Sequence, residues 1–443
     1  MAATTQIAPA AQPVPQNGSF DAHHPPAREI MDKCVHCGFC LPVCPTYTLW
    51  REEMDSPRGR IYLMNMAASG SAALNDTWVG HLDACLGCMA CMTACPSGVD
   101  YGKLIEATRA QIARNYKRSA SEMRFRRFVF NTFTNPARLR SLLLPLKIYQ
   151  KSGLRAVARA TGLLKLLPER LRSMESLLPE LNSTAALPEI TPAVGERRGR
   201  VAILLGCVQS VFLPEVNAAT ARVLAAEGFE VVAPRAQTCC GALLVHAGEE
   251  EQALVLARRM IDTFEAAGAD SIVINAAGCG STMKDYGYLL RDDPKYSARA
   301  AAFSAKCKDL SEFLAGLEPR APRHPLRLRV AYHDSCHLQH AQGVRTQPRA
   351  LLGLIPQLEL VEIPEAQICC GSAGIYNLVQ PHTAEELGDR KAANVVALNP
   401  DAVVSGNPGC LFQLRTALQR ARRPIPVRHT VELLDASIRG ASL

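Results

Sequence analysis

The chain has 443 residues, 48% of them hydrophobic, which favours two to four domains with sizeable cores. Its mean hydropathy is +0.01, and it lacks a run of roughly 18 to 20 apolar residues, so we expect no transmembrane segment. The net charge of +8 is concentrated in residues 109–172, which contain sixteen Lys or Arg and only two acidic residues. A segment this basic is expected to bind an anionic partner. Because no nucleic-acid-binding motif accompanies it, we expect a membrane surface and no nucleic acid.

Residues 1–28, rich in Ala, Pro, Gln and Thr, predict a disordered lead-in. They lack the continuous apolar core of a secretory signal peptide. Seventeen cysteines in a chain without such a signal indicate a reducing compartment, so structural disulfides are not expected.

Two runs of cysteine follow, at residues 34–45 and 85–96, each with the spacing C-x2-C-x2-C-x3-C-P. This spacing is typical of ferredoxins with two [4Fe-4S] clusters, in which the first three thiolates hold one cluster and the fourth reaches the other. We therefore predict Cys34, Cys37, Cys40 and Cys95 as ligands of cluster 1, and Cys85, Cys88, Cys91 and Cys44 as ligands of cluster 2. A zinc site needs only four ligands in total, which argues against zinc.

The predicted cluster domain covers residues 29–110 and is all-helical, with helices at residues 61–68 and from about residue 101. The prolines that follow the fourth cysteines, Pro45 and Pro96, are each expected to begin a helix. Arg58 and Arg60 could face a partner's carboxylates or the charge of a cluster, or lie in a solvated loop.

Residues 111–198 predict a basic helical connector. Basic residues alternate there with apolar stretches at 124–130, 142–146 and 163–168. Amphipathic helices of this kind lie in a bilayer interface, or they pack an apolar stripe against neighbouring domains. Composition alone favours neither interpretation strongly.

The C-terminal half contains an internal duplication. Cys207, the Cys239-Cys240-Gly241 turn and Cys279 recur as Cys336, Cys369-Cys370-Gly371 and Cys410, at offsets of 129, 130 and 131 residues. Three cysteine positions that keep this register predict two domains of one fold, at residues 199–322 and 323–443.

Each copy alternates apolar strands with helices. In the first copy we predict strands at 201–205, 229–233 and 271–275, and helices at 217–227 and 248–267. In the second we predict strands at 329–333, 358–363 and 402–405, and helices at 347–354 and 383–398. Such alternation is typical of an α/β fold with parallel sheets, whose ligands gather at the carboxyl ends of the strands. Each copy should therefore bring its four thiols to one end of its sheet.

The thiols of each copy have two functional interpretations, a further iron–sulfur cluster or a thiol/disulfide pair. The alternative is that they are small buried hydrophobic residues, as we interpret Cys307, which has no counterpart in the repeat. Gly241 and Gly371 predict tight turns that let adjacent sulfurs face one ligand. His333, His337 and His340 surround Cys336 in the second copy only, where they could orient a cluster ligand or carry protons for a quinone.

Over residues 30–435 this layout resembles the iron–sulfur subunits of bacterial glycolate oxidases, whose C-terminal repeats resemble the cysteine-rich CCG domains of heterodisulfide reductases. The stretches that carry the resemblance are residues 34–40 (CVHCGFC), 57–63 (PRGRIYL), 217–224 (NAATARVL), 338–342 (LQHAQ) and 369–374 (CCGSAG). The iron–sulfur subunits of related lactate or glycerol-3-phosphate dehydrogenases, and heterodisulfide-reductase-like disulfide reductases, are alternatives.

The resemblance implies an electron-transfer subunit of an oxidoreductase complex that acts on CH-OH donors with an acceptor other than oxygen. Partner subunits that contain FAD would oxidise glycolate, and D-lactate as a second substrate, and this chain would pass the electrons to an acceptor such as a quinone. It implies a peripheral position on the cytoplasmic side of the inner membrane and no catalytic residue on this chain. The absence of a G-x-G-x-x-G fingerprint after a strand agrees with FAD on the partners and not here.

One departure from the family pattern concerns the repeats. The full pattern ends each repeat in C-x-x-C, but Ala276 and Asn407 replace the first cysteine of that pair. Each repeat therefore has four cysteines in the pattern and not five, which argues against a large non-cubane cluster. A smaller cluster, a dithiol or an empty scaffold are each compatible with the residues.

Overall fold

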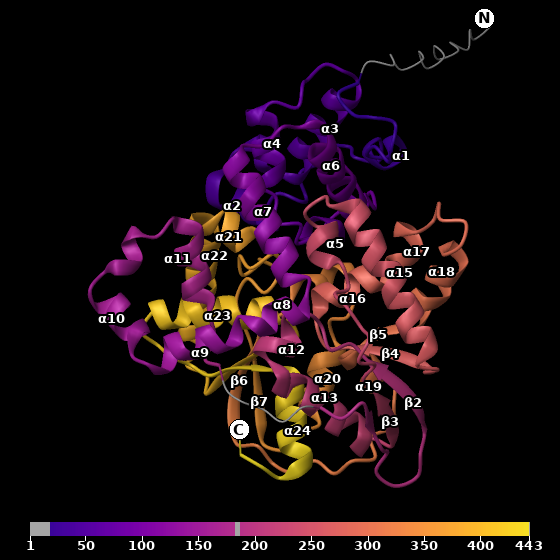
Figure 1. The fold of residues 1–443 in the computed structure, drawn as a ribbon, viewed down its shortest axis with the longest axis vertical. Coiled ribbons are helices and arrows are strands. Elements are labelled where there is room, and N and C mark those ends of the chain that lie inside the picture. Colours follow the sequence, from indigo (N-terminus) through magenta and orange to yellow (C-terminus); the bar gives the residue numbers. More distant parts are fainter. Residues whose placement is uncertain (1–17, 182–186, 443) are drawn as a thin grey trace, which may run out of the picture.

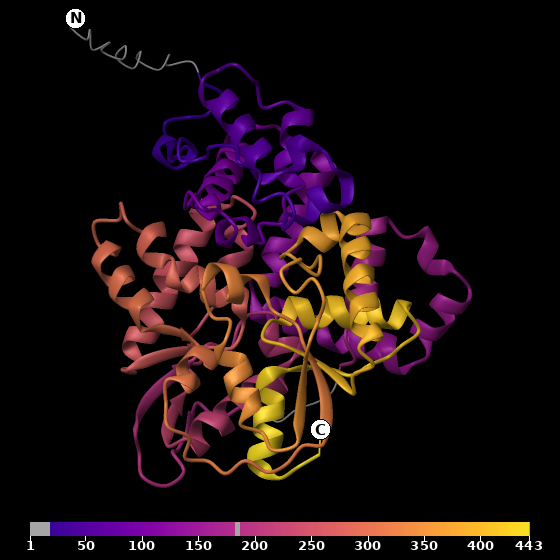
Figure 2. The same ribbon diagram turned by 180° about the vertical axis from the view of Figure 1, so that it is seen from behind.

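The computed structural model describes residues 18–181 and 187–442. Figure 1 shows a helical domain at the N-terminal end, a helical lobe that projects to one side, and two α/β units below them. Seen from behind in Figure 2, the second α/β unit (orange to yellow) lies between the lobe and the first unit. The predicted fold class, an α/β protein with an all-helical cluster domain, a helical connector and duplicated domains, is confirmed.

The N-terminal domain contains helices and no strand within its described residues. Its helices are α1 (Arg28–Met31), α2 (Pro45–Trp50), η1 (Glu53–Asp55), α3 (Pro57–Ala68), α4 (Asp76–Asp83), α5 (Ala90–Thr93) and α6 (Tyr101–Asn115). Met31, Met64, Trp78 and Leu104 form its core. Pro45 begins α2 as expected, whereas the expectation for Pro96 is wrong, because the next helix begins only at Tyr101.

Residues 18–28 of the predicted lead-in have defined contacts. The side chains of Gln111, Arg114 and Asn115 on α6 donate hydrogen bonds to Asp21. Phe20 packs edge-on against Trp78, with ring centroids 6.0 Å apart. The expectation of disorder is therefore wrong for this part, and residues 1–17 lie outside the described residues.

The connector forms the projecting lobe. Its helices are α7 (Ala120–Phe133), α8 (Pro136–Ser141), α9 (Leu143–Lys151), α10 (Leu154–Ala160), η2 (Leu163–Leu166) and α11 (Glu169–Leu177). Val129 and Phe130 of α7 are buried against the first repeat, whereas Leu144 and Leu166 are 69% and 80% exposed. The interpretation as an apolar stripe packed on a neighbouring domain therefore holds for α7, whereas the bilayer interface stays a prediction for the exposed leucines.

The first repeat contains a five-stranded sheet in the order β1-β3-β2-β4-β5. Its strands are β1 (Ile190–Thr191), β2 (Gly199–Ile203), β3 (Phe229–Val232), β4 (Ser271–Ile274) and β5 (Cys307–Asp309). All neighbours pair in parallel except β1, which pairs antiparallel with β3. Its helices are α12 (Gln209–Phe212), α13 (Pro214–Ala226), α14 (Ala242–Val245), α15 (Glu250–Ala266), α16 (Ala277–Lys284), α17 (Tyr286–Leu289), α18 (Ser297–Lys306) and α19 (Leu310–Ala315).

The second repeat has the same strand order without the antiparallel edge, β7-β6-β8-β9, with every pair parallel. Its strands are β6 (Leu328–Tyr332), β7 (Leu358–Glu362), β8 (Ala402–Ser405) and β9 (Val427–His429). Its helices are η3 (His337–Ala341, a π-helical turn), α20 (Gln347–Gly353), α21 (Tyr376–Val379), α22 (Pro381–Ala397), α23 (Pro408–Arg420) and α24 (Thr430–Arg439).

The two repeats share one hydrophobic core. Ile203 and Val231 of the first sheet belong to the same buried cluster as Val330 and Tyr332 of the second, and α13 packs against α24. The sheets are thereby held in a fixed relation, so that the carboxyl ends of β2 and β6 present their cysteines to a common space.

Candidate iron–sulfur sites

The four predicted ligands of cluster 1 line one small pocket near the surface. Three come from the loop that begins at Cys34 and the fourth, Cys95, follows α5. Left-handed backbone conformations at His36 (φ 53°) and Gly38 (φ 88°) fold this loop tightly. Cys37 is exposed, and so are its neighbours Val35 and Phe39 (69% and 65%), so this pocket lies at the edge of the molecule.

The four predicted ligands of cluster 2, Cys44, Cys85, Cys88 and Cys91, are all buried. Burial raises the pKa of the Cys91 thiol well above its usual range, and electrostatic repulsion from Cys88, Cys85 and Cys44 adds to this effect. These buried sulfurs can therefore carry negative charge together only if a cation lies among them, as a metal cluster provides.

Two arginines surround this second group of thiols. The side chain of Arg60 is 1% exposed; it forms an ion pair with Asp55 at 3.1 Å and donates to the His81 carbonyl at 2.7 Å. Arg109 donates to the carbonyl oxygens of Cys85 and, at 2.9 Å, His246. Although burial opposes it, the charges of Arg60 and Arg109 lower the pKa of Cys85.

The interpretation of Arg60 as a solvated or partner-facing residue is therefore wrong, because it lies inside the domain. Arg58 is half-buried, pairs with Glu53 at 2.6 Å and donates to the His36 carbonyl at 2.9 Å. Hydrogen bonds also reach the sulfurs themselves: the Gly87 N–H donates to Cys85 Sγ at 3.3 Å and the Tyr101 hydroxyl at 3.6 Å. Such donors tune the potential of iron–sulfur clusters.

In the first repeat, Cys207, Cys239, Cys240 and Cys279 form a continuous group, called here quartet 1. Cys207 Sγ lies 3.4 Å from Cys239 Sγ, and Cys240 interacts with both Cys239 and Cys279. Cys207 follows β2 and Cys279 lies on α16 after β4, at the carboxyl ends of the strands. Gly241 has φ 83°, as the predicted tight turn requires.

In the second repeat, Cys336, Cys369, Cys370 and Cys410 form the equivalent quartet 2. Cys369 interacts with Cys336 and Cys370, and Cys370 with Cys410. Gly371 has φ 89°, and a Cβ atom there would lie 2.5 Å from the Ala384 carbonyl oxygen, so only glycine fits.

The three histidines of the second repeat have different positions. A ring nitrogen of His333 lies within 4.8 Å of the sulfurs of Cys370 and Cys410, which makes these three residues a candidate metal site. His337 Nδ1 is 3.5 Å from Cys336 Sγ. His340 instead contacts Thr93 of the N-terminal domain, with 2.8 Å between Nδ1 and Oγ1.

The two departures from the family pattern also differ in position. Ala276 is buried before α16 and offers no ligand atom. Asn407 places its Nδ2 3.4 Å from Cys410 Sγ, so it donates a hydrogen bond where the full pattern has a cysteine. Sequence reasoning missed His246 because no motif surrounds it. Its ring lies against that of His337, tilted by 56°, with ring centroids 4.7 Å apart.

The four groups of cysteines follow one another through the molecule. Cys40 of the first group lies near Cys91 of the second. Cys88 of the second group packs in one hydrophobic cluster with Cys369 and Cys336 of quartet 2. Quartets 1 and 2 line one common cavity. The sites therefore form a line that starts at the exposed Cys37 and ends between the repeats.

The residues of the N-terminal domain fit two cubane clusters better than other thiol chemistry. All seventeen cysteines are free in this structure. Each of the first two groups has four sulfurs from two separate runs, with backbone turns that aim N–H groups at the sulfurs. For the quartets, the sulfurs fit either a smaller cluster or a dithiol.

No helix among the described residues has the length and apolar character needed to cross a bilayer.

Fold and sites together define an iron–sulfur electron-transfer protein, with a dicluster domain joined to a duplicated cysteine-rich domain. Family models agree on each part: "4Fe-4S dicluster domain" matches residues 30–99, and "Cysteine-rich domain" matches residues 201–284 and 330–415. "Glycolate oxidase iron-sulfur subunit, linker region" matches residues 121–178.

Comparison with curated relatives identifies the family. A probable glycolate oxidase iron-sulfur subunit of Bacillus subtilis is 40% identical over 426 residues, which are 94% of this chain and 96% of the relative. The glycolate oxidase iron-sulfur subunit of Escherichia coli is 36% identical over 417 residues, 93% of this chain and 95% of the relative. A lactate utilization protein of Exiguobacterium sp. is 31% identical over 242 residues, 54% of this chain and 99% of that protein. The chain belongs to the family of glycolate oxidase iron–sulfur subunits, and the resemblance inferred from its motifs is confirmed.

Proposed function

We propose that this chain carries electrons from the reduced flavin of a partner flavoprotein, which oxidises glycolate to glyoxylate, to an acceptor at the membrane. The observation that carries the proposal is the line of four thiol groups from the exposed Cys37 to the cavity between the repeats. Oxidation of glycolate releases two electrons and two protons, and D-lactate, another 2-hydroxy acid, would release the same number.

Two [4Fe-4S] clusters suit this task, since each accepts and releases one electron when bound. We assign Cys34, Cys37, Cys40 and Cys95 to cluster 1, and Cys85, Cys88, Cys91 and Cys44 to cluster 2. The chain's other residues exclude water from cluster 2 and supply the buried cation Arg60 and the partly buried cation Arg109 beside it.

Electrons would enter at cluster 1. Its pocket lies at the surface, and Val35 and Phe39 beside it are exposed apolar side chains on which a flavoprotein could dock. Cluster 2 lies deeper, next to Cys369 of quartet 2, so it would be the second carrier.

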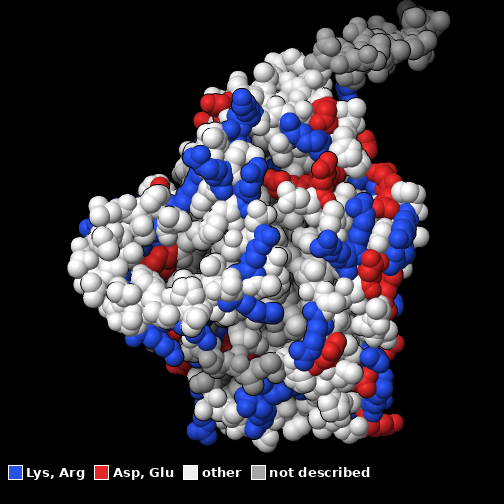
Figure 3. Space-filling view, viewed as in Figure 1, with Lys and Arg blue, Asp and Glu red and all other residues white. Residues whose placement is uncertain are grey.

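The connector would hold the chain on the cytoplasmic face of the inner membrane. Leu144, Val157 and Leu166 expose apolar side chains on the lobe. Figure 3 shows mostly uncharged side chains on the outer face of this lobe, with Lys and Arg along its lower edge. Apolar side chains bordered by basic ones suit an interface with anionic lipids.

The experiment that tests the proposal combines metal analysis with reconstitution. Anaerobically prepared chain should contain at least about eight iron atoms and show cubane EPR signals after reduction. Adding it to the flavoprotein partner should restore glycolate-dependent reduction of a dye, with a Cys34→Ala variant as control. A protein that binds only zinc, or a flavoprotein whose dye reduction is indifferent to this chain, contradicts the proposal.

A second candidate function, disulfide reduction at a quartet, is favoured by the 3.4 Å approach of Cys207 Sγ and Cys239 Sγ. It predicts that Cys239→Ser abolishes the reduction of a thiol-linked disulfide substrate while the EPR signals of the N-terminal clusters persist. Unchanged reduction in that variant would eliminate this candidate for quartet 1.

A further inference from the structure

One large cavity lies where the connector meets the two repeats, with a volume of about 670 Å³. Small-molecule sites typically occupy roughly 300 to 1,000 Å³. All eight cysteines of the two quartets line this cavity.

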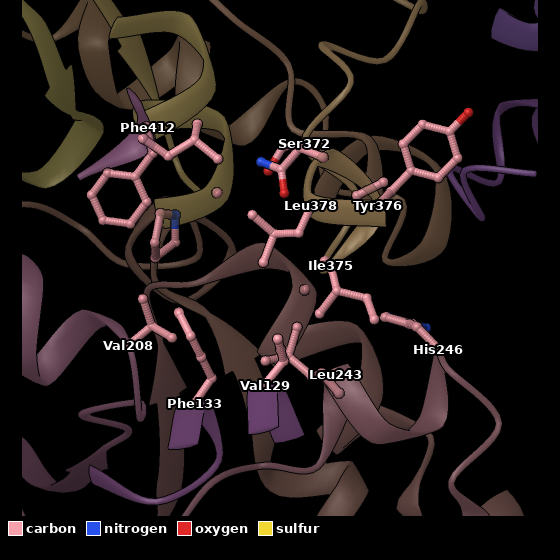
Figure 4. A pocket seen from close by; sticks show the side chains of 18 of the residues that line it. Val129, Phe133, Val208, Leu243, His246, Ser372, Ile375, Tyr376, Leu378 and Phe412 are labelled. Atoms are coloured by element: carbon pink, nitrogen blue, oxygen red, sulfur yellow. The ribbon is translucent and has the colours of Figure 1, made fainter. Parts of the chain in front are cut away.

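Much of the cavity wall is apolar. Figure 4 shows Phe133 of the connector, Val208 and Leu243 of the first repeat, and Leu378 and Phe412 of the second repeat converging on it. These side chains come from five different elements, α7, the turn before α12, α14, α21 and α23. A wall of this composition favours a flat, apolar ligand over a small hydrophilic one.

The polar end of the cavity offers two ring nitrogens without partners. Nε2 of His246 and Nε2 of His337 are both buried, and neither has a hydrogen-bond partner. His246 is held in place from behind, because its Nδ1 lies 3.0 Å from Glu106 Oε1. A buried polar atom without a partner costs free energy unless a ligand supplies the hydrogen bond.

The arginines at the cavity already have partners. Arg126 pairs with Glu122 at 3.2 Å, Arg109 donates to two backbone carbonyls, and Arg170 lies over the Phe125 ring at 5.1 Å. A short carboxylate such as glycolate would therefore find no uncommitted cation among these three side chains. This argues against a second site for the acid substrate.

The cavity wall continues into the exposed apolar surface of the lobe. Leu142 lines the cavity and is also 37% exposed. Leu144 and Ile148, which follow on α9, are 69% and 55% exposed. Figure 3 shows a hollow between this lobe and the body of the molecule. An apolar molecule could therefore pass from a lipid surface to the cavity along these leucine and isoleucine side chains.

We propose that this cavity binds the ring of a lipid-soluble quinone, with a ring oxygen hydrogen-bonded to His246 Nε2 and the tail directed along α9. The proposal rests on the proposed function and supplies its acceptor site on this chain. Reduction of the quinone takes two electrons, delivered one at a time by the chain's clusters, and two protons from solvent water. Both ring carbonyls become hydroxyls. Because Nδ1–H of His246 donates to Glu106, Nε2 donates to a quinone carbonyl when the ring is protonated and accepts from a quinol hydroxyl when the ring is neutral.

The test uses the purified, cluster-loaded chain without its flavoprotein and decylubiquinone as the probe. After reduction with dithionite and removal of the excess, stopped-flow absorbance should show reoxidation that saturates with decylubiquinone concentration. His246→Leu removes the hydrogen bond and Leu243→Trp fills the cavity, so each should raise the half-saturating concentration at least about tenfold. Equilibrium dialysis of the same probe should show a parallel loss of binding.

Matched controls are His382→Leu, at an 87% exposed histidine paired with Glu169, and Leu354→Trp, at a 44% exposed leucine; neither residue lines the cavity. Both should behave as the unaltered chain, and ferricyanide should reoxidise all variants equally. Reoxidation that does not saturate, or that is equal in cavity and control variants, overturns the proposal. This test contains no glycolate, so it does not depend on the flavoprotein. If the proposed function fails, the separate assay with glycolate and the flavoprotein should show no reduction of this chain, while quinone binding stays intact.

Discussion

The two cluster sites proposed for the N-terminal domain come from runs with the same cysteine spacing but have opposite surroundings. Cluster 1 is bounded by solvent at Cys37 and by the half-buried Arg58, whose charge is paired with Glu53. Cluster 2 has four buried cysteines, with the fully buried Arg60 beside it. A buried cation is screened far less than an exposed one, so the environment, and not the motif, should separate the potentials of the two clusters.

The largest effect is expected from loss of a ligand at the buried site. Cys88→Ala should remove about four iron atoms per chain and leave repelling thiols in a dry interior, so the domain should lose most of its stability. Iron analysis and thermal unfolding measure both effects. The matched change at the surface, Cys37→Ala, should lose a similar amount of iron with a smaller decrease in the melting temperature; equal decreases would contradict the comparison.

Arg60→Met should have the next largest effect. The change leaves the buried Asp55 with His81 Nδ1, 3.1 Å away, as its remaining ion-pair partner, and should lower the free energy of unfolding by up to about 3 to 5 kcal/mol. It also removes a positive charge beside Cys85 and Cys44, which should lower the potential of cluster 2 by on the order of 100 mV. An EPR-monitored redox titration measures the shift.

The control for Arg60→Met is the double variant Arg60→Met with Asp55→Asn, which also removes the buried carboxylate charge that has lost its arginine and should recover part of the stability. The potential of cluster 1 should stay within about 20 mV of its value in the unaltered chain, because screening weakens the charge over distance. An equal shift of both clusters would show that the two environments are not electrically distinct.

Arg58→Met should have a small effect on stability. Its pair with Glu53 is partly exposed, and such pairs contribute only about 0 to 1 kcal/mol. In Arg58→Met the reduction potential of cluster 1 should fall, but by less than the potential of cluster 2 falls in Arg60→Met. This decrease should become smaller as the salt concentration increases. A redox titration at low and high ionic strength checks both statements.

Phe39→Asp should have the smallest effect on the chain by itself. Phe39 is 65% exposed, so the free energy of unfolding should change by no more than about 0.5 kcal/mol. If electrons enter at cluster 1, the same change should slow reduction by the flavoprotein while leaving reduction by dithionite unchanged. A matched substitution at a distant exposed residue, Leu354→Asp, should slow neither.

The predicted strands of both repeats were found because their central residues form continuous apolar runs, such as 201–205 and 402–405. β5 and β9 were missed because each has only three residues and its pattern is indistinguishable from a loop. The cysteine groups were predictable because metal ligation demands a spacing that is local in sequence.

What could not be predicted depends on contacts distant in sequence. Asp21 lies in a polar segment, but residues about ninety positions later hold it in place. Arg60 follows Pro57 and Gly59, which suggested a loop, yet Ser56 caps α3 there and directs the arginine into the domain. His246 carries no local signal at all, because only the meeting of the two repeats makes it part of the cavity.

The shared core of the repeats has a consequence for how the molecule unfolds. Leu352 and Val431 of the second repeat are packed in the same cluster as Val216 and Leu224 of the first. Separating the repeats would expose this whole surface to water, at a cost that neither half could recover alone. The duplicated sequence is therefore one cooperative unit in thermal unfolding, and chains cut near residue 322 should not yield two stable fragments.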